Sequence, residues 1–145
     1  MLVRLLYVSR AAEPPTPEAT QSILDSARAY NTPNGITGIL CYGGGMYLQA
    51  LEGGRKQINA LYTQILKDPR HVDVVLLHYE EVVERRFGSW TMGQVNLSKI
   101  NASTILRYSE TVDLDPYTMS GKVTLALLEE LILTASIIGL SLIHI

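Results

Sequence analysis

The sequence has few of the features that mark secreted, metal-binding or nucleic-acid-binding proteins. Its 145 residues contain a single cysteine, Cys41, which excludes an internal disulfide, and its cysteine and histidines lack the spacing of a zinc site. Basic and acidic side chains number 12 and 14, with no basic cluster beyond Arg85-Arg86, so direct binding to DNA or RNA is not expected. Because no signal peptide is recognisable, a cytoplasmic location is expected.

Long apolar runs are also scarce. Residues 131–145 lack Asp, Glu, Lys and Arg, but they fall short of the roughly 20 residues that span a bilayer, and Glu129-Glu130 precede them. No membrane span is therefore expected, and residues 140–145 are expected to form a tail, whether ordered or not. The total length suits one packed domain with an extension.

Residues 1–97 carry alternating strand and helix signals. Thr16 is a suitable N-cap for a helix that stops at residues 31–35, where Asn, Pro and Gly gather. Gly43-Gly44-Gly45 predicts a hairpin turn, and an amphipathic helix follows Gly53-Gly54 and ends near Asp68-Pro69. The expected strands are residues 2–8, 35–42, 46–51, 72–78 and 90–97.

The order of these elements predicts an α+β domain with a ferredoxin-like βαββαββ sheet and two helices on one face. A ligand between helices and sheet would contact inward residues of the first and third strands, which include Tyr7 and Gln49. An inward tyrosine is usually a core aromatic. Gln49 is more informative, because glutamine is seldom buried unless its amide is satisfied.

Five segments in this order resemble the BLUF family, whose members sense blue light with a bound flavin. The resemblance covers residues 1–97 and rests on residues 5–9, Asn31 with residues 34–38, residues 47–53, residues 68–71, and Arg86-Phe87 leading to Trp90 and Met92. It implies a photoreceptor whose cofactor is FAD, with FMN and riboflavin as alternatives.

The resemblance also implies roles for individual residues. Tyr7 and Gln49 would form a hydrogen-bonded pair beside the flavin, and Asn31 would hold the pyrimidine edge of the ring. Trp90 and Met92 would complete the switch by changing their packing or exposure. The other implied cofactor contacts are Leu24, Ile65, Asp68, Arg70 and His71, with the arginine suited to phosphate.

Each role has a structural alternative. Asn31 also fits a helix breaker, and residues 68–71 also fit a solvated helix exit with cations near the helix dipole. Trp90 and Met92 also fit the core face of an alternating strand. Three positions depart from residues found in some family members, and they put the detailed pocket and the flavin preference in doubt: Tyr30, Ala27 and Gln64.

The implied mechanism leaves the cofactor chemically unchanged. Under blue light, Tyr7 would donate an electron and then a proton, and the pair would recombine with the Gln49 amide rotated or tautomerised. A new hydrogen bond to flavin O4 would shift absorption to the red. Such a change acts by biasing an element that already has two arrangements, here the fifth strand and the residues C-terminal to it. No enzyme activity is implied.

Residues 98–139 are predicted to form a C-terminal helical extension of the photosensory domain at residues 1–97. Residues 101–108 and 122–135 look helical, and the second carries an apolar stripe that packs either on the open sheet face or on another subunit: Val123, Leu127, Leu128, Leu131 and Ile132. The extension is too short for an output enzyme. The short, stand-alone family type therefore implies homo-oligomers and a separate response protein contacted in a light-dependent way.

Two other functions are compatible with the residues. A flavin-dependent enzyme would need an acid/base pair beside the cofactor, and the chain has only the scattered His71, His78 and His144. A cofactor-free ferredoxin-like interaction module would use every inward Tyr, Met and Trp as core. The colour of the purified protein separates this module from a flavoprotein, whereas turnover with an electron donor would favour an enzyme.

Overall fold

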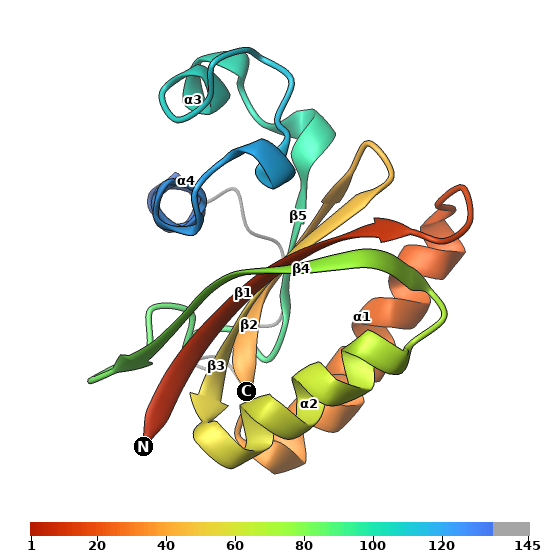
Figure 1. Cartoon of the computed structure of the whole chain (residues 1–145), viewed down its shortest axis with the longest axis vertical. Helices are drawn as coiled ribbons and strands as arrows, with labels where there is room; N and C mark the ends of the chain where they lie inside the picture. The colour runs from red at the N-terminus through yellow and green to blue at the C-terminus, as the bar shows by residue number, and fades with distance from the viewer. Residues whose placement is uncertain (135–145) are drawn as a thin grey trace.

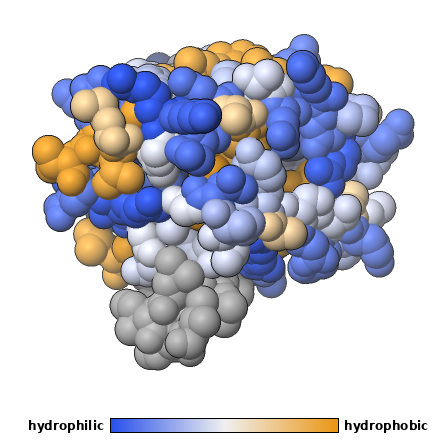
Figure 2. All heavy atoms as spheres, turned by 90° about the horizontal axis from the view of Figure 1, so that it is seen from below, coloured by the Kyte–Doolittle hydropathy of each residue, from blue (hydrophilic) through white to orange (hydrophobic). Residues whose placement is uncertain are grey.

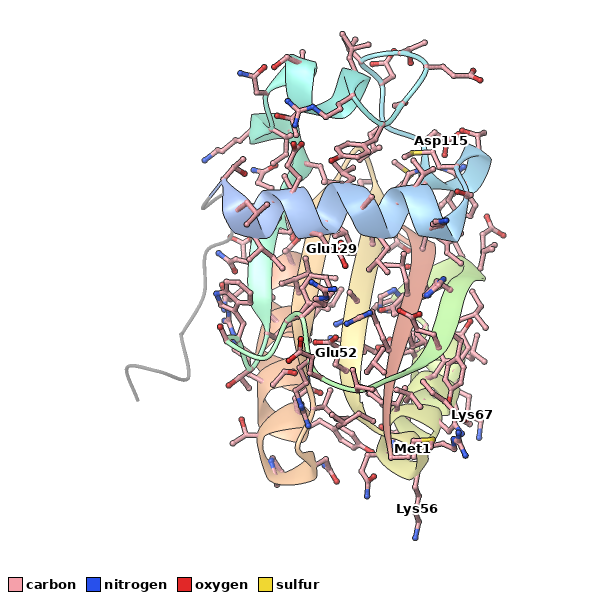
Figure 3. All side chains as sticks on the ribbon, turned by 90° about the vertical axis from the view of Figure 1, so that its left-hand side faces the viewer. Met1, Glu52, Lys56, Lys67, Asp115 and Glu129 are labelled. Carbon is pink, nitrogen blue, oxygen red and sulfur yellow. The ribbon has the colours of Figure 1, made fainter. Side chains whose placement is uncertain are left out.

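A computed structural model describes residues 1–134. Within this range five strands form one sheet in the order β4-β1-β3-β2-β5, with α1 and α2 on one face and α4 across the other (Figures 1 and 3). The strands are β1 (Leu2–Ala11), β2 (Thr37–Gly43), β3 (Met46–Gly54), β4 (His71–Val82) and β5 (Gly93–Asn96). The α-helices are α1 (Pro17–Asn34), α2 (Arg55–Lys67), α3 (Ala102–Leu106) and α4 (Gly121–Leu133). The predicted α+β, ferredoxin-like architecture is confirmed.

The ends of α1 are set by its terminal residues. The Thr16 side chain accepts a hydrogen bond from the backbone N–H of Ala19 at 3.1 Å, which caps the first turn. At the other end Gly35 adopts a φ of 66°, a left-handed conformation that suits glycine and closes the helix. This closure leaves Asn31 in the last turn, facing the protein interior.

The register of the central strands brings the two predicted switch residues together. β1 pairs antiparallel with β3, and Tyr7 lies directly opposite Gln49. Side chains of directly opposite residues share one face of a sheet. Because β1 and β3 are interior strands, both residues lie under the helices rather than at an edge.

The sheet separates two apolar cores. The first lies under α1 and α2 and includes Tyr7, Leu24 and Met92. The second lies under α4 and includes Phe87 and Leu128. Of the predicted stripe on α4, Leu128 and Leu131 are buried in this second core together with Leu125, so the helix packs on its own sheet. Leu127 is also buried, and Ile132 packs against the second core. Val123, from the same predicted stripe, is 38% exposed.

The start of α4 approaches β4 closely. A Cβ atom at Gly121 would lie 2.0 Å from the backbone oxygen of Leu77, so only glycine fits at this position. Tyr117, just before α4, donates a hydrogen bond to the backbone oxygen of Asp73 at 2.7 Å and stacks its ring under the Arg10 guanidinium. The N-terminal end of α4 is therefore attached to β4 through backbone contacts.

Several element boundaries differ from the predictions. β1 extends to Ala11 rather than residue 8, and β3 extends to Gly54 rather than residue 51. β5 begins at Gly93 rather than at Trp90, so Trp90 and Met92 do not alternate on one strand face: Trp90 packs against the second core and Met92 lies in the first. β4 extends to Val82, beyond the predicted residue 78. α3 is shorter than predicted, and Ala135 with the predicted tail lies outside the described residues.

One face of the molecule is mostly polar with separate apolar patches (Figure 2). Seen from below, hydrophilic side chains predominate and apolar ones gather in several places (Figure 2). Among residues 1–134, no helix is long and apolar enough to cross a membrane.

Candidate functional site

A cavity of about 420 Å³ lies between α1, α2 and the sheet. It is lined by side chains from both helices, from β1 and β3, and from the segment that joins α2 to β4. The lining residues are Tyr7, Ile23, Ser26, Ala27, Tyr30, Asn31, Gln49, Leu61, Gln64, Ile65, Lys67, Asp68, Arg70 and His71. A mostly apolar concave site with a few convergent polar groups is typical of cofactor binding.

A chain of three hydrogen-bonded side chains runs from the floor of this cavity into the first core. The Tyr7 hydroxyl donates to Gln49 Oε1 at 2.5 Å, and Gln49 Nε2 donates to Met92 Sδ at 3.4 Å. All three side chains are buried. Burial, with a smaller contribution from the negative charge of Asp68, raises the pKa of Tyr7 far above that of a free tyrosine, so the phenol is neutral and acts as a donor.

Asn31 presents an unpaired acceptor to the cavity. Its side chain is fully buried, and Nδ2 donates to the backbone oxygen of Thr91 at 3.3 Å. Its Oδ1 atom has no hydrogen-bond partner among the described residues. Because a buried acceptor without a donor is unfavourable by about 1–3 kcal/mol, this atom fits a ligand that brings an N–H group. The pyrimidine edge of a flavin carries such a group, so the residues present fit the implied cofactor.

Asp68 and Arg70 form an ion pair beside the cavity. Arg70 Nη2 lies 2.7 Å from Asp68 Oδ2, and Arg70 Nη1 reaches Ser22 Oγ at 3.4 Å. Partial burial alone would raise the pKa of Asp68, but the hydrogen bonds and positive charge of Arg70 outweigh it and lower the pKa. The Arg70 guanidinium is thus partly neutralised, whereas Lys67 also lines the cavity and carries a charge with no ion pair among the described residues.

His71 links the cavity to β1. Its Nδ1 atom lies 2.8 Å from the hydroxyl oxygen of the buried Ser9, and its ring packs edge-on against Tyr7 and Tyr47 with centroid separations of 6.2 and 5.2 Å. Burial lowers the pKa of His71, which outweighs the opposing effect of the nearby Asp68 charge. The imidazole is therefore held in its neutral form in this position.

Most predicted site residues line the cavity, and three do not. Leu24 is buried in the first core but outside the cavity, whereas its neighbour Ile23 is in the lining. Met92 reaches the site only through Gln49, and Trp90 lies on the other side of the sheet. The three positions that depart from the family pattern also line the cavity: Ala27, Tyr30 and Gln64.

Sequence reasoning missed four lining residues. Ile23 and Ser26 precede Tyr30 by seven and four positions on α1, and Leu61 precedes Ile65 by four on α2. These are the spacings of one helix face, so applying the helical period outward from Tyr30 and Ile65 would have found them. Lys67, the fourth, has no signal of this kind because it is an ordinary cation at a helix end.

No group of three or more His, Cys, Asp or Glu side chains within residues 1–134 is placed to hold a metal ion. Cys41 is buried in the second core, where burial raises the pKa of its thiol.

Comparison with known proteins gives consistent matches. The model of the BLUF family, described as sensors of blue light using FAD, matches residues 2–93. The photoactivated adenylate cyclase subunit beta of Euglena longa is 37% identical over 92 residues, which are 63% of this chain but 11% of that protein. This chain thus spans about a tenth of that relative's length.

Two solved structures share the fold over almost their whole length. The photo-activated state of BlsA has a TM-score of 0.78 and 29% identity, and the likeness covers 90% of this chain and 94% of that one. The dark-state structure of BlrB, a BLUF protein, has a TM-score of 0.76 and 30% identity over 92% of this chain and 96% of that one. With a family match over more than half its length, the chain belongs to the BLUF family of blue-light sensors that use FAD.

Proposed function

We propose that this chain is a blue-light photoreceptor that binds a flavin non-covalently in the cavity between α1, α2 and the sheet. The observation that carries this proposal is the Tyr7–Gln49 hydrogen bond, placed in one cavity with the unpaired Oδ1 atom of Asn31. FAD is the first candidate, because the family is described by it. FMN and riboflavin share the ring system and remain alternatives, since the groups that support the assignment face the ring.

Apolar and charged parts of the lining suit different parts of the ligand. Ile23 and Ile65 give the ring an apolar environment, while Lys67 and Arg70 are available to its phosphate end. Asp68 orients Arg70 through its bidentate contacts. His71 is neutral and braced by Ser9, so it would contribute hydrogen bonding rather than charge.

The bound flavin supplies the absorption of blue light and, once excited, an electron acceptor. Tyr7 is the electron donor in this proposal, because its ring lies on the cavity floor. A buried phenol that loses an electron becomes strongly acidic, and its hydroxyl has one hydrogen-bond partner among the described residues, Gln49 Oε1. Electron loss from Tyr7 is therefore coupled to proton transfer toward the Gln49 amide, and both the electron and a proton return to Tyr7 when the pair recombines.

Gln49 is the part of the network that stays changed. Its Oε1 atom accepts from Tyr7 and its Nε2 atom donates to Met92. Rotation or tautomerisation of the amide would therefore exchange the donor and acceptor groups that face these two residues. A different hydrogen-bonding pattern at the cavity floor is expected to shift the absorption of the ligand to the red. The energy of this rearrangement is that of a few hydrogen bonds, so it acts by shifting an existing equilibrium.

The output of the sensor passes through β5 and the C-terminal helices. Residues 1–97 act as the photosensory domain in this proposal, and residues 98–139 as an extension that a partner protein contacts in a light-dependent way. α4 lies on the second core, which contains Phe87 and against which Trp90 also packs, so movement near β5 is expected to reach α4 through this core. We propose neither catalysis nor direct nucleic-acid binding for these residues, and we expect a homo-oligomer.

The proposal is tested by the visible absorption spectrum of the purified protein before and after blue illumination, followed through recovery in the dark. The expected result is a yellow protein with oxidised-flavin bands that shift reversibly to longer wavelength. A protein that stays colourless after incubation with FAD, FMN and riboflavin would contradict flavin binding. Bleaching without a red shift would contradict the photoreceptor mechanism and favour ordinary flavin redox chemistry.

A further inference from the structure

The connection between β4 and β5, residues 83–92, is attached to the sheet at both ends. It leaves β4 after Val82, crosses the sheet face that α4 covers at the level of Glu52, and enters β5 at Gly93 (Figure 3). We refer to residues 83–92 as the β4–β5 strap. Its residues lie in both cores, since Phe87 is in the second core and Met92 in the first.

The first attachment is made by the carboxylate of Glu52. This side chain is fully buried, and its Oε1 atom accepts a hydrogen bond from the backbone N–H of Phe87 at 2.6 Å. Its Oε2 atom accepts from the backbone N–H of Arg86 at 2.9 Å and from Arg4 Nε at 2.8 Å. Charge-assisted bonds of this kind are strong and directional. Glu52 therefore fixes two consecutive peptide groups of the strap.

Two strap side chains reinforce this attachment. Arg85 donates to Thr37 Oγ1 at 2.9 Å, to the backbone oxygen of Glu52 at 3.2 Å and to that of Gly35 at 2.7 Å. The Phe87 ring is fully buried. Residues 85–87 are thus held in three ways: by the hydrogen bonds from the backbone N–H groups of Arg86 and Phe87 to Glu52, by the hydrogen bonds of the Arg85 guanidinium, and by burial of the Phe87 ring.

The second attachment lies at the cavity. The backbone oxygens of Trp90, Thr91 and Met92 accept hydrogen bonds from the Gly38 N–H at 3.2 Å, from Asn31 Nδ2 at 3.3 Å and from Arg28 Nη2 at 3.0 Å. The Met92 side chain has a weaker contact, since its Sδ atom is a poor acceptor for Gln49 Nε2 at 3.4 Å. Gln49 and Glu52 are three residues apart on β3 and point to opposite faces of the sheet. A single strand therefore holds the Glu52 end of the strap on one face and its switchable side chain, Met92, on the other.

We propose that Glu52 is a positioning residue for the light response. By holding residues 85–87 still, it confines the movement caused by loss of the Gln49–Met92 contact to residues 88–92, which include Trp90. This inference rests on the proposed role of Gln49 as the switch. Without the Glu52 attachment, the same rearrangement would be spread over the whole strap and would displace Trp90 less.

The test uses the one tryptophan of the chain as its reporter. Trp90 labelled as 5-fluorotryptophan gives a single ¹⁹F signal in the whole flavin-loaded protein, recorded in the dark and under blue light. Glu52→Gln keeps the side-chain volume but replaces one acceptor oxygen with a donor, so at least one of its three bonds is lost. We expect an unchanged red shift, a broadened dark signal, and a light-minus-dark displacement of the Trp90 signal reduced about twofold or more.

Glu80→Gln is the matched control. Glu80 also pairs with Arg4, at 2.6 Å, but within the described residues it forms no hydrogen bond or ion pair with the strap, so its variant should keep the Trp90 signals of the wild type. If Glu52→Gln does not fold, Arg4→Met/Glu52→Gln removes both buried charges together and should show the same loss. If folded Glu52→Gln shows the same Trp90 signals as the wild type, Glu52 does not position the strap. If the wild-type protein itself shows no red shift, the proposed function is contradicted instead, and the width of the dark-state signal in Glu52→Gln still tests whether Glu52 holds the strap.

Discussion

On the sheet face covered by α4, the buried Glu52 carboxylate has three donors within the chain, whereas on the face covered by α1 and α2 the buried Oδ1 atom of Asn31 has none among the described residues. The first arrangement is complete without a ligand. The second leaves a hydrogen-bonding atom and a cavity of about 420 Å³. The comparison indicates that one face is built for stability and the other for a molecule that completes it.

The largest expected effect is at the cavity floor. Gln49→Leu replaces the amide that joins Tyr7 to Met92 with an apolar side chain of similar size, so the protein should bind flavin and lose the light-induced red shift entirely. Difference absorption spectroscopy measures this directly. Gln94→Leu is the control. Leu40 of β2 pairs with Gln49 of β3 on one side and with Gln94 of β5 on the other, and Gln94 does not line the cavity. A red shift in the Gln49 variant would refute the switch.

The α4 face should show the largest loss of stability. Leu128→Ala truncates a fully buried side chain of the second core and should lower the free energy of unfolding by about 2–5 kcal/mol. Urea denaturation of the flavin-free protein measures this value. Val123→Ala, on the same helix but 38% exposed, should cost less than about 1 kcal/mol. Equal losses for the two variants would mean that α4 does not pack on the sheet in solution.

Asn31 separates ligand binding from folding. Asn31→Ala removes both the bond to Thr91 and the unpaired acceptor, and we expect the Kd for FAD to rise about tenfold, or ~1.4 kcal/mol, with a smaller change in apoprotein stability. Flavin fluorescence titration of the apoprotein gives the Kd. Asn34→Ala is the control, since Asn34 donates to the Tyr30 backbone oxygen outside the cavity. Equal Kd values for the two variants would exclude Asn31 as a ligand contact.

The smallest expected effect is that of pH on the Asp68–Arg70 pair. The folded-state pKa of Asp68 is lowered, so its contribution to stability is present above its unfolded-state pKa and is lost as the pH falls through the lower folded-state value. Because the pair is partly exposed, the contribution should be at most about 1 kcal/mol. Wild type and Asp68→Asn should therefore converge in stability below about pH 4. Denaturation of both proteins at a series of pH values from pH 7 downward measures this difference in stability. A difference that stays constant with pH would mean that the ion pair contributes nothing.

The element order and the central pair were predictable from the sequence. Strand alternation and the glycine and proline breaks place β1, β3 and their inward residues Tyr7 and Gln49, and the helix stop places Asn31. The exclusion of Leu24 from the cavity was not predictable, because Leu24 precedes the lining residue Asn31 by seven positions just as Ile23 precedes Tyr30, and both are apolar. The rotation of a helix on a sheet is set by packing across the core.

Trp90 and Arg70 illustrate two other limits. Residues 90–92 precede β5 and do not follow a strand period, so the alternation that the sequence predicts does not apply to Trp90 and Met92. The side chain of Arg70, the proposed phosphate contact, folds back onto Asp68, two residues earlier, and this pairing was not predicted. Such short-range pairing depends on local backbone conformation and side-chain rotamers, which residue types alone do not determine.

The glycine at the start of α4 has a mechanical consequence. Because Gly121 brings the helix backbone against the Leu77 carbonyl, that end of α4 has no side chain between itself and β4 that could act as a cushion. The C-terminal half of α4 is held by buried side chains instead, Leu128 and Leu131. A shift of β4 at Leu77 would therefore press on the helix backbone itself and carry the whole helix with it, including its 86% exposed last residue, Leu133.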